Sequence, residues 1–321
     1  MNITVIGSGR WGSFLAWYLS GQGHSVLMYG RKGSHSYETL KNERKNEYLT
    51  LSDSVMFTDS LSDALNASGT IVISVGAQGF PELVTEIKET LSGNGGKEYL
   101  LCMKGIVENG GKRLSEVLYE ILGEETKCAV WLGPGHAEDF TKGIPNCMLF
   151  ASKDESFAKD LCEKFGSQLI RFYYSTDVIG CEVGAAAKNV IGIAAGMLDG
   201  FNYSSLKGAL MARGPREIAR LTTVMGGDER SIFGLCHLGD YEATLFSPHS
   251  HNRRFGEMYV RGESYDKLAE GVYTVRSLMY LKDKYGVEMP ICSAVNSIVH
   301  ENKNPHDVLS SLFLREQKSE F

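Results

Sequence analysis

The sequence predicts an α/β fold in which a doubly wound, mainly parallel sheet is followed by a second, all-α domain. Short apolar runs alternate with amphipathic stretches over roughly the first 175 residues, which is typical of βαβ units. A glycine-rich loop follows the first apolar run directly. After Asp177 the strand patterns give way to helical ones.

The first part of the chain carries apolar runs that predict strands. They are Asn2–Ile6, Ser25–Tyr29, Thr70–Val75, Tyr99–Met103, Ala129–Leu132, Cys147–Ala151 and Leu169–Tyr173. Helical patterns lie between several of them, at Trp11–Ser20, Phe80–Leu91, Arg113–Leu122 and Phe157–Phe165. Helices of this length between strands indicate crossover connections and parallel pairing.

The second part shows helical patterns and no convincing strand. Gly184–Met197 (GAAAKNVIGIAAGM) is rich in small residues and predicts a buried, tightly packed helix. Further helices are expected at Leu206–Thr223, Tyr273–Lys284, Cys292–His300 and His306–Phe313. We therefore expect a dinucleotide-binding domain over residues 1–177 and an all-helical substrate and catalytic domain over residues 178–321.

Composition limits the class of protein. The 33 Lys+Arg and 39 Asp+Glu residues give a net charge of −6, which favours neither nucleic acid nor anionic membrane as a partner. The seven cysteines are scattered without metal-ligand or redox spacing, so a reduced, cytoplasmic compartment is expected. We expect no signal peptide and no apolar stretch near the ~20 residues of a membrane span.

The opening ITVIGSGRWGSFLAWYL places Gly7, Gly9 and Gly12 in a G-x-G-x-x-G pattern between a strand and a helix. Such glycines allow a tight turn and close approach of a pyrophosphate to a helix N-terminus. The context predicts a Rossmann-type site for a dinucleotide. The alternative is a glycine-rich turn that only shapes the corner.

The end of the second predicted strand bears on the choice of cofactor. An acidic residue there would bind the ribose 2′-hydroxyl of NAD, but the chain has Gly30-Arg31-Lys32. Two cations suit a 2′-phosphate, so NADP(H) is favoured without excluding NAD(H). Arg31 could instead be a solvated surface charge.

Two lysines stand out among small residues. Lys104 follows the strand pattern Tyr99–Met103 and is placed at the carboxyl edge of the sheet, where ligands bind in such folds. Lys188 lies in a segment almost devoid of charge. If both face one cleft, repulsion and burial would lower a lysine pKa and suit it to acid–base catalysis. The alternative is that each side chain reaches out to solvent.

A third cluster lies in HLGDYEATLFSPHSHNRRFG, interpreted as a proline-containing loop. It combines an acid, hydroxyls, an amide and cations, namely Asp240, Thr244, Ser250, His251, Asn252, Arg253 and Arg254. Such a set suits a phosphate, with one carboxylate left to orient a lysine. A metal bound by His249 and His251, or a merely solvated loop, are the alternatives.

These motifs resemble the NAD(P)-dependent glycerol-3-phosphate dehydrogenase family of the bacterial type along nearly the full chain. The matching pieces are IGSGRWG, MKGIVENGGKRLSEVL, LGPGHAEDFTKGIPN, CEVGAAAKNVIGIAAGMLDG, ALMARG, GLCHLGD, NRRFG and LAEGVYTV. The resemblance implies hydride transfer between NAD(P)H and dihydroxyacetone phosphate, giving sn-glycerol 3-phosphate for phospholipid synthesis. It also implies a Rossmann-type domain joined to a helical one.

The resemblance also implies residue roles. Lys188 matches the proton donor and acceptor, Lys104 a second lysine near substrate and cofactor, and Asp240 the acid that holds them. Besides the glycines and Arg31, cofactor-lining positions are Lys104, Arg10, Trp11, Ala137, Leu268 and Glu270. Substrate positions are Lys104, Gly133, Gly135, Lys188, Asn189, Asp240, Thr244, Ser250, His251, Asn252 and Arg253; no metal site is implied.

Three departures from the family pattern touch the pocket. His251 stands where the family has an arginine expected to contact substrate phosphate, and Gly135 replaces a hydroxyl residue. The loop after Asp199-Gly200 is rewritten as FNYSSLKG. If His251 takes over the phosphate, its imidazolium form is needed. A dehydrogenase of another small phosphorylated or hydroxy-acid substrate, or a catalytically idle redox sensor, are rival functions. A homodimer through the small-residue helix is also expected.

Overall fold

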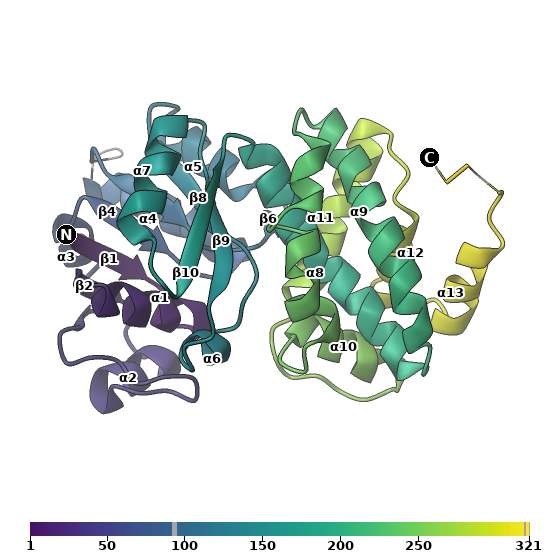
Figure 1. Cartoon of the computed structure of the whole chain (residues 1–321), viewed down its shortest axis with the longest axis horizontal. Coiled ribbons are helices and arrows are strands. Elements are labelled where there is room, and N and C mark those ends of the chain that lie inside the picture. The colour runs from purple at the N-terminus through teal and green to yellow at the C-terminus, as the bar shows by residue number, and fades with distance from the viewer. Residues whose placement is uncertain (92–94, 318, 321) are drawn as a thin grey trace.

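The computed structural model describes residues 1–91, 95–317 and 319–320, which form two lobes (Figure 1). One lobe contains the sheet and its covering helices, and the other is built of helices. Both halves of the chain thus contain the kinds of secondary structure that the sequence predicts: strands and helices in the first, helices in the second. The mainly parallel, Rossmann-type fold with a helical second part is confirmed.

Within the described residues, eight strands form one sheet in the order β10-β9-β8-β5-β4-β1-β2-β3. Their bounds are β1 Asn2–Ile6, β2 Ser25–Tyr29, β3 Met56–Thr58, β4 Thr70–Ile73, β5 Glu98–Leu101, β8 Lys127–Leu132, β9 Asn146–Ala151 and β10 Ile170–Ser175. Neighbours pair in parallel except β8 with β9. The strand order reverses between β1 and β4, so the crevice for a ligand opens beyond the carboxyl ends of these two strands.

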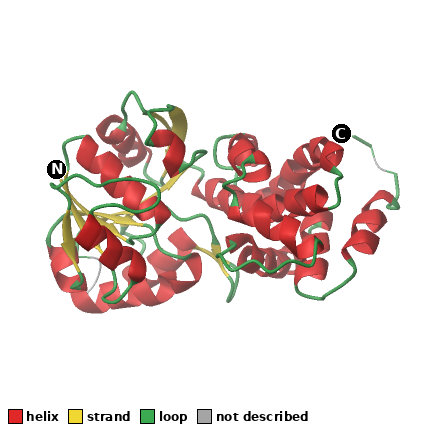
Figure 2. Ribbon diagram, turned by 90° about the horizontal axis from the view of Figure 1, so that it is seen from below, coloured by secondary structure: helices red, strands yellow, loops and turns green. Residues whose placement is uncertain are grey.

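Helices cover both faces of this sheet (Figure 2). They are α1 Arg10–Gly21, α2 His35–Glu43, α3 Leu61–Asn66, α4 Phe80–Leu91, α5 Leu114–Leu122, α6 Ala137–Phe140 and α7 Glu155–Phe165. Phe14 of α1 and Phe165 of α7 belong to one buried apolar cluster, whereas Phe80 of α4 and Leu118 of α5 belong to another. Two separate cores on one sheet account for the near-continuous apolar runs of β4 and β5.

Short elements were absent from the sequence prediction. They include β3, α2 and α3, and a two-stranded ladder of β6 Ile106–Val107 with β7 Lys112–Arg113. Elements of two to six residues carry too little periodicity to be recognised in a sequence, and α2, with nine residues, buries only Tyr37 and Leu40. Tertiary contacts hold them, as for Ile106, which is buried in the core of the helical lobe.

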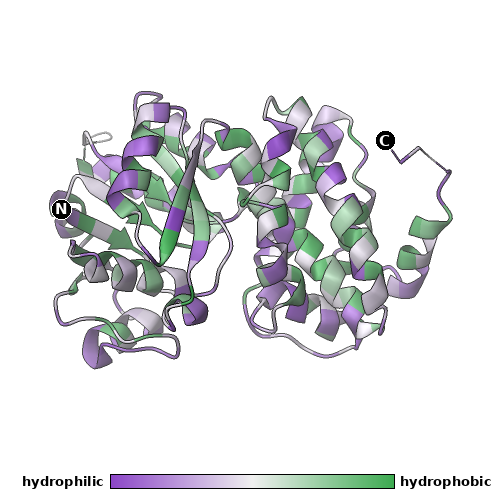
Figure 3. Cartoon of the chain, in the orientation of Figure 1, coloured by the Kyte–Doolittle hydropathy of each residue, from purple (hydrophilic) through white to green (hydrophobic). Residues whose placement is uncertain are grey.

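The helical lobe contains α8 Val178–Gly200, α9 Lys207–Val224, α10 His251–Val260, α11 Glu270–Tyr285, α12 Pro290–Val299 and α13 Pro305–Phe313. Figure 3 shows that these helices carry both hydrophobic and hydrophilic residues. Helix α8 lies at the centre and packs against α9, α10, α11 and α12. No strand occurs in the described part of the chain after β10.

Helix α8 corrects one expectation. In length and composition this helix could cross a membrane, contrary to the expectation that no segment comes near that limit. Almost all of it is buried inside the protein, because the other helices surround it. We therefore interpret α8 as a core helix, which passes the same test of length and composition.

Glycines let α8 and α10 touch backbone to backbone. A Cβ atom at Gly196 would overlap the carbonyl of Arg253, and one at Gly256 would overlap the carbonyl of Ile193. Side chains larger than hydrogen at these positions would separate the helices. The contact fixes where α10 lies along α8.

Candidate active site

The two lobes bring the two predicted lysines together. Lys104 follows β5 at the carboxyl edge of the sheet, and Lys188 projects from the middle of α8. Asp240, in a short 3₁₀ turn over Leu238–Asp240, lies between them. Its Oδ2 atom lies 2.7 Å from Nζ of Lys104 and 3.1 Å from Nζ of Lys188. Residues more than 130 positions apart in the sequence thus form one site.

The environment of Lys188 differs from that of Lys104. The pKa of Lys188 is lowered to about 8, mainly by burial and also by the charge of Lys104, while Asp240 opposes the shift. The Lys104 side chain is 23% exposed and also donates to the Gly133 carbonyl at 2.7 Å. The lowered pKa suits Lys188 to proton transfer near neutral pH.

Neighbouring polar groups fix Lys188 in place. Its Nζ donates to Oγ1 of Thr244 at 2.6 Å, and that hydroxyl donates to the Asp240 carbonyl at 2.7 Å. Asn189 donates from Nδ2 to the Lys104 carbonyl at 3.2 Å, which links α8 to the sheet edge. With these contacts Lys188, buried in an apolar helix, has a partner rather than an exit to solvent.

His237, which the sequence prediction passed over, links α8 to the segment that carries Asp240. Its Nδ1 donates to the Gly184 carbonyl at 2.7 Å, so its Nε2 accepts from the Tyr241 hydroxyl at 2.7 Å. Burial lowers the pKa of His237 to about 4, and the charge of Lys188 adds to this. The ring is a neutral, structural hydrogen-bonding group.

The segment predicted as a loop over residues 237–256 is largely helical. A π-helix spans Glu242–Phe246 and carries Thr244, and α10 begins at His251. Ser250 is the N-cap of α10, where its side chain accepts from the Arg253 amide at 3.3 Å. Asn252 accepts from the Gly271 amide at 2.9 Å and thus joins α10 to α11. The π-helix was not recognisable from the sequence because it depends on contacts made by distant residues.

Arg253 lies in an ion-pair network. Its Nη1 atom contacts Asp199 at 2.8 Å and Glu257 at 3.0 Å. The neighbouring Arg254 is exposed. The cations of the NRRFG motif therefore differ: one is held within the helical lobe and the other reaches solvent.

His251 differs from the expected imidazolium. Its Nδ1 pairs with the Tyr265 hydroxyl. Burial lowers the pKa of His251, and the charges of Arg10, Lys267 and Arg254 lower it further. The imidazole is therefore neutral at pH 7, because it is partly buried and three cations lie near it.

The glycine loop fits a dinucleotide. Gly7 has φ of 115°, and a Cβ there would overlap the Ser74 carbonyl, while one at Gly12 would overlap the Gly7 carbonyl. Gly9, the N-cap of α1, has nothing within 4 Å of its Cβ position. The loop is thus tight against β4 but open beside the N-terminus of α1, where a pyrophosphate binds.

Glu270 supplies a second sign of a bound group. Its carboxylate lies beside Gly76 and Gly105, and its buried Oε2 has no hydrogen-bond partner among the described residues. Burial raises the pKa of Glu270. A buried acceptor without a partner at the mouth of the crevice fits a ligand that carries donors, such as a ribose.

Other expected cofactor positions begin with Arg10 and Trp11, at the start of α1. Arg10 pairs with Glu138 at 2.5 Å, approaches His136 Nδ1 at 3.2 Å and reaches the His249 carbonyl at 3.5 Å. Trp11 packs on Phe14. Three further positions are found at the start of α6, after β2 and before α11: Ala137 is buried, and Arg31 and Leu268 are exposed.

His136 connects the lobes beside Arg10. It accepts from Arg10 at Nδ1, and its Nε2 donates to the Ala243 carbonyl at 3.1 Å. Burial and the charge of Arg10 lower the pKa of His136 to about 4. Sequence reasoning missed His136, Glu138 and Tyr265, because only tertiary structure brings them to the site.

No group of three potential metal ligands occurs among the described residues. His249 and His251 diverge: the first ring stacks edge-on against His136, while the second contacts Tyr265. The described cysteines form no disulfide.

Comparison with known proteins identifies relatives of the whole chain. Sequence models of the N-terminus and the C-terminus of NAD-dependent glycerol-3-phosphate dehydrogenase match residues 2–158 and 177–310. A glycerol-3-phosphate dehydrogenase [NAD(P)+] of Fusobacterium nucleatum is 34% identical, and the match covers 100% of this chain and 98% of that protein. Its counterpart in Pelodictyon phaeoclathratiforme is 36% identical, with 100% and 99% coverage.

A solved structure agrees with these relatives. The crystal structure of a glycerol-3-phosphate dehydrogenase from Coxiella burnetii has a TM-score of 0.90 and 30% identity. The similarity covers 98% of this chain and 99% of that one.

Proposed function

The chain belongs to the NAD-dependent glycerol-3-phosphate dehydrogenase family, and we propose that it interconverts dihydroxyacetone phosphate and sn-glycerol 3-phosphate with NADPH or NADH. This reaction would feed glycerophospholipid synthesis. The observation that carries the proposal is the buried Lys188 ammonium, held by Asp240 and Thr244 at the edge of the dinucleotide crevice. A binding module without catalysis has no need of such a group.

The three charged residues divide the chemistry. When bound, the nicotinamide supplies or accepts the hydride at the substrate carbon. In the direction of ketone reduction, Lys188 Nζ gives a proton to the carbonyl oxygen, and in oxidation it takes that proton back. Lys104 stabilises the negative charge that develops on this oxygen. Asp240 keeps both ammonium groups close, since two lysines and one carboxylate leave a single net positive charge.

We assign the cofactor to the crevice beyond β1 and β4. Gly7, Gly9, Gly12 and the N-terminus of α1 would hold the pyrophosphate, with Arg10 and Trp11 beside it. Glu270 would accept from a ribose hydroxyl or the carboxamide, Ala137 and Leu268 would line the pocket, and Arg31 would face the 2′-phosphate of NADPH.

We assign the substrate to the space between Lys104, Lys188 and the π-helix. Asn189, Thr244 and the turns at Gly133 and Gly135 would shape it, with Ser250, His251 and Asn252 at its far end. His251 would act there as a neutral hydrogen-bonding group, since nearby cations already provide positive charge.

The test is steady-state kinetics with dihydroxyacetone phosphate, with NADPH and NADH in parallel. Unphosphorylated dihydroxyacetone and small 2-keto acids serve as comparison substrates. We expect kcat/KM to be highest for dihydroxyacetone phosphate. A keto acid that exceeds it would favour a diverged dehydrogenase, and cofactor binding without turnover of any substrate would favour a redox sensor.

We also propose that residues 1–177 and 178–321 act as the cofactor-binding and catalytic domains of a cytoplasmic homodimer. The sequence predicted a dimer contact through α8, but α8 is enclosed within its own lobe and has little surface for a partner. Phe313 and Leu314, 67% and 86% exposed at the end of α13, are better candidates for a contact between subunits. We expect no nucleic acid partner and no stable membrane insertion.

A further inference from the structure

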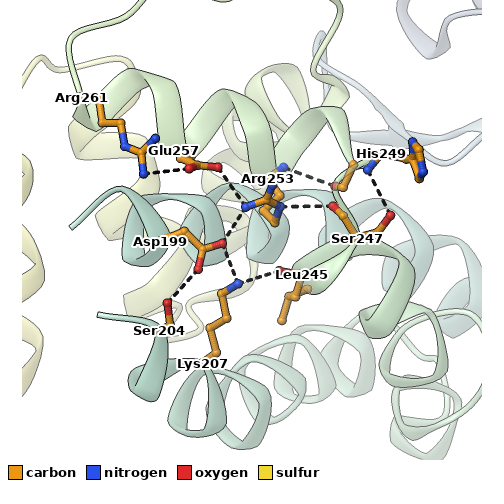
Figure 4. Close-up of polar contacts among 10 residues, drawn as sticks. Asp199, Ser204, Lys207, Leu245, Ser247, His249, Arg253, Glu257 and Arg261 are labelled. Carbon is orange, nitrogen blue, oxygen red and sulfur yellow. Dashed lines mark hydrogen bonds and ion pairs between the residues drawn. The ribbon is translucent and has the colours of Figure 1, made fainter. Parts of the chain in front are cut away.

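A buried charge cluster lies next to the π-helix that presents Thr244 (Figure 4). We name Asp199, Lys207, Arg253 and Glu257 the Asp199 cluster. Asp199 sits near the end of α8, and its Oδ2 accepts from Lys207 Nζ at 2.6 Å and from Arg253 Nη1 at 2.8 Å. Its Oδ1 accepts from the Ser204 hydroxyl at 3.2 Å. One carboxylate thus joins α8, α9 and α10.

Both cations of the cluster also bind the backbone of the active-site segment. Lys207 Nζ donates to the Leu245 carbonyl at 3.0 Å, and Arg253 Nε donates to the Ser247 carbonyl at 3.2 Å. Carbonyls at the end of a helix lack partners within the helix, and Lys207 satisfies that of Leu245. The Ser247 carbonyl accepts from Arg253 and also from the Ser250 amide at 3.3 Å. Leu245 directly follows Thr244, whose hydroxyl accepts from Lys188.

Burial makes the central carboxylate necessary. The side chains of Lys207 and Arg253 are 9% and 14% exposed, and a buried cation without a counter-charge is strongly unfavourable. Although burial opposes ionisation, the hydrogen bonds and charges of Lys207 and Arg253 lower the pKa of Asp199. The carboxylate is therefore ionised at neutral pH, and both cations stay paired.

We propose that Asp199 is a positioning residue which, through Lys207 and Arg253, holds the Glu242–Ser250 segment so that Thr244 meets Lys188. Arg253 then acts through the backbone of this segment and not by touching the substrate phosphate. The inference rests on the proposed function for its kinetic part only. The position of the segment can be measured without any substrate.

The first variant is Asp199→Asn, which removes the charge and keeps the shape. A displacement of the segment by about 1 Å should lower kcat for reduction of dihydroxyacetone phosphate by up to about 100-fold. The affinity for NADPH, measured by fluorescence titration, should stay the same because the cluster lies in the helical lobe. Asp228→Asn is the matched control, since Asp228 pairs with Arg230 at 2.5 Å on the surface of the same lobe.

The same variant separates the two roles of Arg253. If Arg253 bound the substrate phosphate, removal of the competing Asp199 carboxylate would free its guanidinium and lower KM for dihydroxyacetone phosphate. A lower KM with unchanged kcat would overturn the proposal. Lys207→Met should reduce kcat as well. The double variant of Asp199→Asn with Lys207→Met should lose no more kcat than the worse single variant, since both residues act on one segment.

Hydrogen exchange of the free enzyme provides the independent readout. Amides of residues 242–250 should exchange faster in Asp199→Asn and not in Asp228→Asn. Unchanged exchange would overturn the proposal, even if the wild-type enzyme failed to turn over dihydroxyacetone phosphate and the proposed function fell. Should Asp199→Asn not fold, Arg253→Lys keeps the pair with Asp199 while losing the fork geometry, and the same exchange comparison applies to it.

Discussion

Replacement of Lys188 by alanine tests the assignment of the proton donor most directly. With a pKa of about 8, this ammonium is about nine-tenths protonated at pH 7, so the wild-type enzyme has the donor ready. Lys188→Ala should lower kcat for ketone reduction by about 10²–10⁴-fold, the usual contribution of a positioned acid. The Kd for NADPH should not change, because Lys188 contacts Thr244 and Asp240 and not the glycine loop.

The pH dependence of kcat should differ in direction between ketone reduction and alcohol oxidation. Reduction requires protonated Lys188, so the wild-type kcat should fall above about pH 8, approaching tenfold per pH unit. Oxidation of glycerol 3-phosphate requires the neutral amine and should rise over the same range. Both limbs should be absent in Lys188→Ala, and added methylamine should restore part of the rate.

The assay is the change in NAD(P)H absorbance at saturating cofactor across this pH range. A residual kcat within a few-fold of wild type would refute the role of Lys188. An alkaline limb that persists in Lys188→Ala would assign the titration to another group.

Three further outcomes are expected. Arg31→Ala should raise KM for NADPH and leave KM for NADH unchanged; equal effects on both cofactors would remove Arg31 from the 2′-phosphate site. His251→Arg should lower KM for dihydroxyacetone phosphate. His251→Ala should leave the pH profile of KM above about pH 7 unaltered, since the imidazole is already neutral there. A wild-type KM that rises with pH, and a flat profile in His251→Ala, would instead show that the imidazolium form binds the phosphate. The folded-state pKa of Glu270 is raised by burial, so its charged form costs stability at pH values above that pKa. Glu270→Gln should therefore raise the Tm of the cofactor-free protein near pH 7. Calorimetry should show this advantage shrinking as the pH falls through the raised pKa and absent below about 4.5.

The sequence predicted the long elements well because their periodicity is strong. The pattern Phe80–Leu91 coincides with α4, and the small-residue segment Gly184–Met197 lies within the longer α8. Lys104 and Lys188 stood out for a physical reason, namely charge among small apolar residues, and the structure brings them to one carboxylate.

The other features of the site depend on contacts between residues far apart in the chain, which a sequence does not show. The π-helix at Glu242–Phe246 follows from donors on α9 and α10, so a pattern of local residues predicted only a loop. The state of His251 depends on Tyr265 and on cations from other elements. The motif of Arg253 predicted a ligand for phosphate from its charge, and it could not show the ion pair of Arg253 with Asp199.

The backbone contact between α8 and α10 also limits how this sequence can drift. Gly196 and Gly256 face main-chain atoms of the opposite helix, so every replacement adds a Cβ where no volume exists. At an ordinary core position, a neighbour can shrink to compensate for a larger residue. Here the neighbouring atoms belong to the main chain, so no substitution can make them smaller. These two positions should therefore change last among the apolar residues of the lobe.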